Sequence, residues 1–92
     1  MKLLVFKAVW CGPCRIMKKI IDAYIEQHPE VKDRIEFLDV DDERNRDLAV
    51  HYGAMSIPTM LLMKDEDENQ IIIERHVGQM SPAQFAEFVR PL

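Results

Sequence analysis

Residues 9–19 contain both cysteines of the chain, in the sequence VWCGPCRIMKK. Cys11 and Cys14 are separated only by Gly12 and Pro13, and they stand between an apolar segment and a segment with helical periodicity. Two sulfurs so close in sequence can bind a metal, form a structural cross-link, or make and break a disulfide as part of a reaction. The rest of the chain discriminates between these three roles.

The pattern of apolar residues predicts seven segments of regular structure. Continuous apolar runs bounded by polar residues are typical of strands, and apolar residues recurring every three or four positions are typical of helices. A glycine that follows a helical segment marks the C-terminal end of the helix, and a Ser-x-x-Gln sequence marks the N-terminal end. In order, the predicted elements are a strand over residues 2–10, a helix from Pro13 to His28, a strand over 35–40, a helix over 43–52 closed by Gly53, a hairpin of strands over 59–63 and 71–76, and a helix after Ser81.

This order, β-α-β-α-β-β-α, predicts an α/β fold. The first strand, helix and second strand form a right-handed parallel crossover, and the later hairpin is antiparallel. The expected architecture is a four-stranded mixed sheet flanked by three helices. Because 92 residues are too few for two domains, we expect residues 1–92 to form a single domain.

Composition excludes several classes of protein. Apolar residues make up 48% of the chain and charged residues 30%, and the formal net charge is −4. These values argue against a disordered chain and against a nucleic-acid surface. No window approaches the roughly 20 apolar residues of a membrane helix, and the N-terminal segment lacks the features of a signal peptide. We expect a soluble, cytoplasmic protein in which the acidic run over 65–68 is a solvated loop.

A metal site and a structural cross-link both fit the cysteines poorly. A structural zinc site takes four ligands, whereas this chain has one cysteine pair and three isolated histidines, His28, His51 and His76. A metal site shared between two copies of the chain is the one remaining alternative of this kind, and we expect no metal. A disulfide between Cys11 and Cys14 closes almost no loop, so it would stabilise the folded state little. In a reducing compartment, a cysteine pair is more often catalytic or metal-binding than structural.

Redox chemistry has a physical basis at this position. Cys11 falls where the first strand meets the first helix, and there the unpaired backbone N–H groups and the positive end of the helix dipole favour an anion. We therefore expect a depressed pKa for the Cys11 thiol, which makes it the attacking nucleophile. Cys14 lies one turn into the helix, where we expect a more buried sulfur that resolves the mixed disulfide. Gly12 allows close approach of a partner, and Pro13 stiffens the turn.

Three stretches of the chain resemble the thioredoxin family. The sequence WCGPC, residues 10–14, resembles the active-site motif. Residues 39–59, DVDDERNRDLAVHYGAMSIPT, resemble the strand, helix and loop that lead into the family's cis-proline, and residues 77–89, VGQMSPAQFAEFV, resemble its glycine turn and last helix. The resemblance covers nearly the whole chain, from about Leu3 to Val89. It implies a minimal thioredoxin fold and a thiol–disulfide oxidoreductase.

The resemblance also implies the reaction and its partners. Cys11 would attack a disulfide of a protein substrate, and Cys14 would then release the reduced product from the mixed disulfide. The electrons would come from a thioredoxin reductase or another donor, and no cofactor is expected. The Gly-Pro between the cysteines is similar to the reducing branch of the family. We expect a monomer that binds neither nucleic acid nor a membrane.

A substrate groove beside the cysteines is implied in the same way. The resemblance makes Pro58 the cis-proline, and the substrate chain would pair with the backbone of Ile57 like an added strand. Trp10 and Gly78 would border this groove. The substrate-binding residues that we expect are therefore Trp10, Gly12, Pro13, Ile57, Pro58 and Gly78.

The arrangement of the sheet is expected to depart from the usual family pattern. Most thioredoxins have a further strand and helix before the active-site strand, and this sequence has no residues for them. The strand over 35–40 is then expected at an edge of the sheet, beside the first strand, with Glu36 and Asp39 protecting that edge. The first and third helices should share one face of the sheet, and the second helix should lie alone on the other.

A second departure removes a proton acceptor. Thioredoxins usually bury an aspartate six residues before the nucleophile, with a lysine beside it on the adjacent strand, and these positions are Val5 and Phe37 here. We expect Cys14 to lose its proton to water or to the departing thiolate, and to resolve mixed disulfides more slowly than in an aspartate-bearing relative. Lys7 replaces the usual aromatic residue, which predicts a more basic rim of the groove.

Two other functions need to be separated from disulfide reduction. A glutaredoxin-like enzyme would draw electrons from glutathione, although the Gly-Pro motif is not the one that glutaredoxins usually carry. A thioredoxin-fold binding subunit of a larger assembly would use the groove alone, although both cysteines are present. Met55 and Met80 lie beside the groove segments in sequence, where methionine serves either as core or as an adaptable contact surface.

Overall fold

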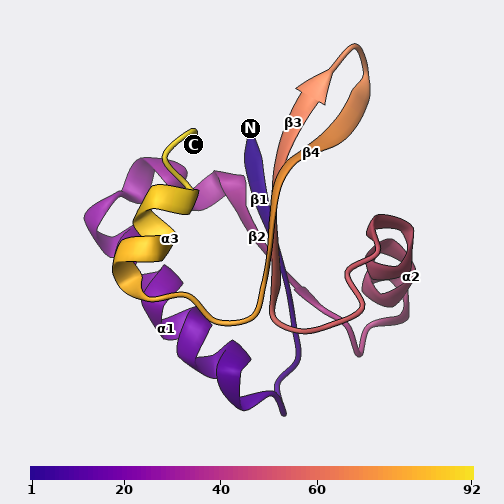
Figure 1. Ribbon diagram of the computed structural model, residues 1–92, viewed down its shortest axis with the longest axis horizontal. Coiled ribbons are helices and arrows are strands. Elements are labelled where there is room, and N and C mark those ends of the chain that lie inside the picture. Colours follow the sequence, from indigo (N-terminus) through magenta and orange to yellow (C-terminus); the bar gives the residue numbers. More distant parts are fainter.

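The computed structural model describes residues 1–92 and contains one four-stranded sheet with α-helices on both faces (Figure 1). The order of elements confirms the expected β-α-β-α-β-β-α fold, and none of the helices is long and apolar enough to cross a lipid bilayer. The strands are β1 (Lys2–Lys7), β2 (Ile35–Asp39), β3 (Thr59–Glu66) and β4 (Asn69–Val77), and the α-helices are α1 (Gly12–Gln27), α2 (Glu43–Tyr52) and α3 (Pro82–Phe88).

Strand β1 lies inside the sheet, whose order is β2-β1-β3-β4. It runs parallel to β2 and antiparallel to β3, so that Val5 pairs with Phe37 on one side and Met60 on the other. An inner strand covered on both faces needs apolar side chains in both directions, which explains the continuous run over 3–6. The expected place of β2, at the edge beside β1, is confirmed.

The two faces of the sheet carry separate hydrophobic clusters. Leu3 and Val5 of β1 point to the face covered by α1 and α3, whereas Leu4 and Phe6 point to the face covered by α2 (Figure 1). This alternation follows from the two-residue period of a strand. Each of these four side chains is almost fully buried, and burying such a side chain contributes about 1.5–3 kcal/mol. The predicted distribution of helices over the two faces is confirmed.

The ends of α2 and α3 follow the local signals in the sequence. The Asp42 carboxylate accepts a hydrogen bond from the backbone N–H of Arg44 at 2.9 Å and so caps the start of α2. Gly53 ends this helix with φ +69°, a left-handed conformation that glycine adopts at little cost. At α3, Ser81 and Gln84 form the predicted reciprocal capping box.

Two segments differ from the sequence-based expectation. Strand β1 ends at Lys7 instead of continuing to Trp10, because the chain turns there and the Cys11 N–H donates to the Ala8 carbonyl at 3.2 Å. The segment Pro29–Arg34 forms a 3-10 helix between α1 and β2. It was not expected, since Val31 is its only buried residue and a single apolar residue gives no periodicity.

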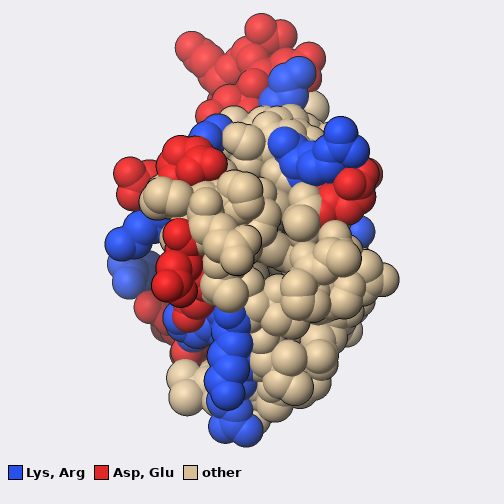
Figure 2. Space-filling view, turned by 90° about the vertical axis from the view of Figure 1, so that its left-hand side faces the viewer, with Lys and Arg blue, Asp and Glu red and all other residues tan.

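The prediction that residues 65–68 form a solvated loop is confirmed for Asp67 and Glu68 and wrong for Asp65 and Glu66, although all four are exposed. Asp65 and Glu66 belong to β3 and pair with β4, while Asp67 and Glu68 form a two-residue turn with φ values of 50° and 70°. Two consecutive positive φ values match the twist of a hairpin. The hairpin extends beyond the rest of the sheet, and its acidic side chains gather at that end of the molecule (Figures 1 and 2).

Candidate active site

Cys11 and Cys14 form a disulfide where β1 leads into α1, with 5.2 Å between their Cα atoms. Cys11 is the N-cap of α1, and its sulfur accepts a hydrogen bond from the backbone N–H of Cys14 at 3.2 Å. Cys14 is the more buried of the two, 2% exposed against 6% for Cys11. These observations confirm the expected N-cap position of Cys11 and the deeper position of Cys14.

The N-cap geometry favours a negative charge on Cys11 when the disulfide is reduced. Its sulfur stands at the positive end of a 16-residue helix and faces a backbone N–H that is free to donate. A thiolate is the nucleophile in thiol–disulfide exchange, so stabilising the anion raises its population at neutral pH. Cys11 can therefore serve as the attacking sulfur, with Cys14 one turn behind it.

The loop between α2 and β3 brings a second backbone segment to the disulfide. Cys11 Sγ lies 4.0 Å from the carbonyl oxygen of Ile57, and the peptide bond between Ile57 and Pro58 is cis. The Pro58 carbonyl accepts a hydrogen bond from the Gly78 N–H at 2.8 Å, which joins this loop to the end of β4. Gly78 has φ +96°, a conformation that a side chain would strain. The predicted cis-proline is confirmed.

Trp10 lies on the surface beside this loop. Its side chain is 67% exposed, and its indole N–H donates to the carboxylate of Asp41 at 3.0 Å. A pocket of about 240 Å³ separates Trp10 from α2, and Met55 and Ile57 are among its mostly apolar lining residues. Such exposure excludes a packing role for Trp10. Asp41 was not expected at the site, because nothing in the sequence indicates a partner for the indole.

Gly12 and Pro13 occupy the first turn of α1. Pro13 is exposed, and a helix loses nothing there by lacking an N–H. A Cβ atom on Gly12 would meet no other atom of the chain within 4 Å, so the space beside it is free for another molecule. The structure thus brings the six predicted groove residues around Cys11, while their role in substrate binding stays a prediction.

The two methionines near the groove have different environments. Met80 is 3% exposed and belongs to the cluster under α1 and α3, where its N–H lies 3.1 Å from the Met17 sulfur. Met55 is 74% exposed at the rim of the Trp10 pocket. Met80 is therefore core, and Met55 is the one available for contact with another molecule.

Val5 and Phe37 occupy the positions at which thioredoxins usually have an aspartate and a lysine, and neither side chain can accept a proton. Val5 is 1% exposed in the cluster beneath α1 and α3, and its strand neighbour Phe37 packs against the same cluster. Lys7 lies at the end of β1 and lines a small pocket together with Cys14, Arg15 and Lys18. Arg15 and Lys18 were missed as site residues. The spacing of four between Cys14 and Lys18 on a helix could have indicated Lys18, whereas Arg15, one residue after Cys14, gives no such signal.

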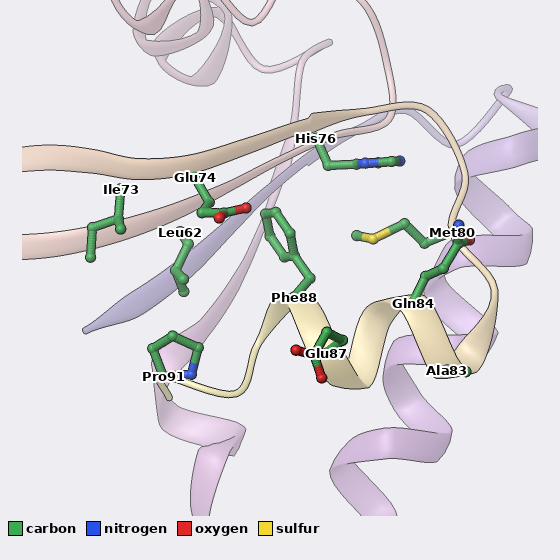
Figure 3. A pocket seen from close by; sticks show the side chains of 10 residues that line it. All are labelled: Leu62, Ile73, Glu74, His76, Met80, Ala83, Gln84, Glu87, Phe88 and Pro91. Atoms are coloured by element: carbon green, nitrogen blue, oxygen red, sulfur yellow. The ribbon is translucent and has the colours of Figure 1, made fainter.

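The largest cavity, about 620 Å³, lies elsewhere, between β4 and α3 (Figure 3). The ring of Phe88 projects from α3 toward β4, and Glu74 and Glu87 stand on opposite sides of the cavity (Figure 3). Neither cysteine and none of the six predicted groove residues lines it. We therefore assign the candidate active site to the disulfide and its groove.

Comparison with known proteins agrees with this geometry. The family model "Thioredoxin" matches residues 1–90. Thioredoxin from Bacillus subtilis (strain 168) is 36% identical over 73 residues, which are 79% of this chain and 64% of the relative. Thioredoxin from Haemophilus influenzae is 32% identical over 87 residues, or 95% of this chain and 75% of the relative. The chain thus spans about two thirds to three quarters of the length of these curated relatives.

Solved structures show the same similarity in three dimensions. Mitochondrial thioredoxin 3 from Saccharomyces cerevisiae, in its oxidized form, superposes with a TM-score of 0.76 and 29% sequence identity. The match covers 98% of this chain and 76% of the yeast chain. With the disulfide at the start of α1 and the family model matching almost every residue, the chain belongs to the thioredoxin family of thiol–disulfide oxidoreductases.

Proposed function

We propose that the protein reduces disulfides in other proteins through the Cys11–Cys14 pair. In the reduced protein, the Cys11 thiolate attacks one sulfur of the substrate disulfide, which forms a mixed disulfide and releases the other substrate sulfur as a thiolate. Cys14 then attacks Cys11, which closes the internal disulfide and releases the second substrate sulfur. Two electrons pass from the cysteine pair to the substrate.

The observation that carries this proposal is the position of Cys11 at a helix N-cap beside the Ile57 backbone. The N-cap favours the thiolate, and the neighbouring loop offers backbone groups to an extended substrate chain. Substrates are then protein segments that can lie extended next to their own disulfide. Trp10, Gly12, Pro13, Ile57, Pro58 and Gly78 would contact them.

The remaining features of the function are inferred from the family. We propose that residues 1–92 act as a single monomeric domain in the cytoplasm, where they take part in electron transport and thiol homeostasis. A thioredoxin reductase is the proposed electron donor. Glutathione as donor, and a binding role without redox turnover, are the alternatives that the experiment below separates.

The test is reduction of insulin disulfides by the wild type, Cys11→Ser and Cys14→Ser. With dithiothreitol as donor, the wild type should accelerate the reaction, and each serine variant should fall to the uncatalysed rate because turnover needs both sulfurs. In a separate reaction, pre-reduced Cys14→Ser freed of dithiothreitol should trap a mixed disulfide with insulin, detectable by mass spectrometry, and Cys11→Ser should trap none. A wild type that does not exceed the uncatalysed rate would support the binding role and refute disulfide reduction.

The same assay identifies the electron donor. Thioredoxin reductase with NADPH and glutathione with its reductase are supplied in turn to the wild type. Turnover with the first alone supports the proposal. Turnover with glutathione alone supports a glutaredoxin-like enzyme.

A further inference from the structure

The pocket beside Cys14 has a volume of about 130 Å³, room for several water molecules at about 30 Å³ each. Its lining residues are Lys7, Ala8, Val9, Cys14, Arg15 and Lys18. No other pocket of the molecule is lined by Cys14, whose side chain is otherwise almost fully buried. The pocket is therefore the route by which a proton can leave the Cys14 thiol for solvent.

The ionisable side chains that line this pocket all carry positive charge. Lys7 comes from β1, and Arg15 and Lys18 come from α1. No Asp or Glu side chain lines the pocket. A positive charge close to a thiol favours its ionised form. The pocket at Cys14 thus offers cations to its thiolate and no carboxylate to receive its proton.

Lys7 is the cation whose charge solvent screens least. Its side chain is 21% exposed, whereas that of Lys18 is 48% exposed and bound to Asp22 at 2.8 Å. Arg15 is exposed and forms no ion pair. Charges on exposed side chains act weakly because water and salt screen them. Lys7 is the candidate with the largest effect on Cys14.

Asp39, the register partner of Lys7 on the neighbouring strand, forms an ion pair with it. Its Oδ2 atom lies 3.8 Å from the Lys7 ammonium, and its Oδ1 atom accepts a hydrogen bond from the Asp41 N–H at 2.9 Å. Asp39 comes from β2 and does not line the pocket. The carboxylate is thus fixed by a backbone contact, and it restrains the Lys7 ammonium at the pocket that Cys14 also lines.

We propose that Lys7 stabilises the Cys14 thiolate through its positive charge and so assists the resolving step, in place of a buried proton acceptor. The proposal rests on the disulfide reduction proposed above. The Cys14 proton passes to water in the pocket, and the thiolate attacks Cys11 Sγ. The Cys11–Cys14 bond forms, the bond from Cys11 to the substrate sulfur breaks, and the substrate leaves as a thiolate. The cysteine pair is oxidised and the substrate reduced by two electrons.

The first test measures ionisation of Cys14 and does not depend on enzymatic activity. In a Cys11→Ser background, Cys14 is the only thiol, and its thiolate is followed by ultraviolet absorbance across a pH titration. Lys7→Met should raise the pKa of Cys14 by about one unit, a tenfold change in the thiolate fraction at neutral pH. Lys7→Arg keeps the charge and should restore the wild-type midpoint. Lys19→Met is the matched control, because Lys19 is an exposed cation of α1 outside the pocket.

The second test measures the resolving step itself. With both cysteines present, stopped-flow reaction with an aromatic disulfide releases one thiolate on attack by Cys11 and a second on resolution by Cys14. Lys7→Met should slow the second release about tenfold at pH 7, with its pH midpoint moved upward, and change the first release much less than the second. A Lys7→Met variant that titrates and resolves like Lys19→Met overturns the proposal, as does a Lys7→Arg variant shifted as far as Lys7→Met. If the wild type fails to reduce insulin but Lys7→Met still shifts the Cys14 titration, the proposed function is rejected and the effect of Lys7 on Cys14 is not.

Discussion

The two sulfurs of the disulfide lie in different environments, although their Cα atoms are only 5.2 Å apart. Cys11 faces polar backbone, which is the N-terminus of α1 and the Ile57 carbonyl before the cis-proline. Cys14 is the more buried sulfur, packed in a small apolar cluster with Ala8 and beside a pocket lined by basic side chains. The side proposed to meet the substrate therefore has the cis-proline and N-cap that the family resemblance implies, while the side proposed to release the second proton lacks the family's buried aspartate.

This difference indicates that attack and resolution are built from separate parts of the fold. Attack by Cys11 depends on the N-terminus of α1 and on the loop before β3. Resolution by Cys14 depends on the side chains of Val5 and Lys7 in β1. Substitutions on one side should then change one step and leave the other unchanged. The following variants test that separation, from the largest expected effect to the smallest.

Val5→Asp should produce the largest change. It places a carboxylate in a core position that is 1% exposed, and an unpaired buried charge costs about 3–5 kcal/mol of the free energy of unfolding at neutral pH. The same carboxylate supplies the missing proton acceptor, so resolution by Cys14 should become faster while attack by Cys11 stays unchanged. Urea unfolding and the two-phase stopped-flow assay measure these effects. Val5→Asn is the control, and resolution equally fast in both variants would contradict a role for the carboxylate.

Gly78→Ala acts on the Cys11 side. At φ +96°, a Cβ atom costs about 1–2 kcal/mol, and relief of this strain would shift the backbone that borders the groove. We expect a several-fold increase in KM for insulin and an unchanged resolving rate. Gly53→Ala is the matched control, because Gly53 also has a positive φ but ends α2 outside the groove. If Gly78→Ala and Gly53→Ala change the KM for insulin equally, the cause is the loss of stability and not the position of Gly78 beside the groove.

Asp42→Ala should lower the free energy of unfolding by an amount that depends on pH. It should alter neither the attack by Cys11 nor the resolution by Cys14. Hydrogen bonds from the side chain and the backbone N–H of Arg44 lower the pKa of Asp42 below its usual range. Because the folded-state pKa is the depressed one, the cap stabilises the fold above about pH 4 and is lost as the pH falls through the folded-state value.

The difference in free energy of unfolding between wild type and Asp42→Ala should accordingly narrow from pH 6 to pH 3. Urea unfolding at several pH values measures it. The control is Asp47→Ala, which removes an exposed carboxylate from the same helix away from its N-cap. A difference that is constant with pH would show that the capping carboxylate is not the cause.

Local signals in the sequence predicted most of the fold. The bounds of α2 follow from its polar start and from Gly53, and α3 follows from its capping box, because these signals act within a few residues. The hairpin was predicted, but the length of its strands was not. Lys64–Glu66 and their partners extend past β1, and exposed strand residues carry no apolar pattern.

The candidate site was predictable where it depends on the motif and not where it depends on tertiary neighbours. The N-cap position of Cys11 follows from the strand-to-helix junction, and the cis-proline follows from the family resemblance. The contact between Trp10 and Asp41 spans 31 residues, and the pocket at Cys14 combines β1 with α1. Such contacts depend on how segments distant in the sequence pack against one another, and the composition of a single segment does not reveal this.

The position of β1 in the chain and in the sheet has a consequence for biosynthesis. Cys11 and Ile57 are separated by 46 residues, so a ribosome adding roughly 5–20 residues per second completes the cysteine motif seconds before the loop that forms its groove. Strand β1 must wait equally long for β3, its antiparallel neighbour. During that interval the nascent chain carries the two thiols without the Ile57 loop, and the proposed substrate groove is complete only when the middle of the sheet closes.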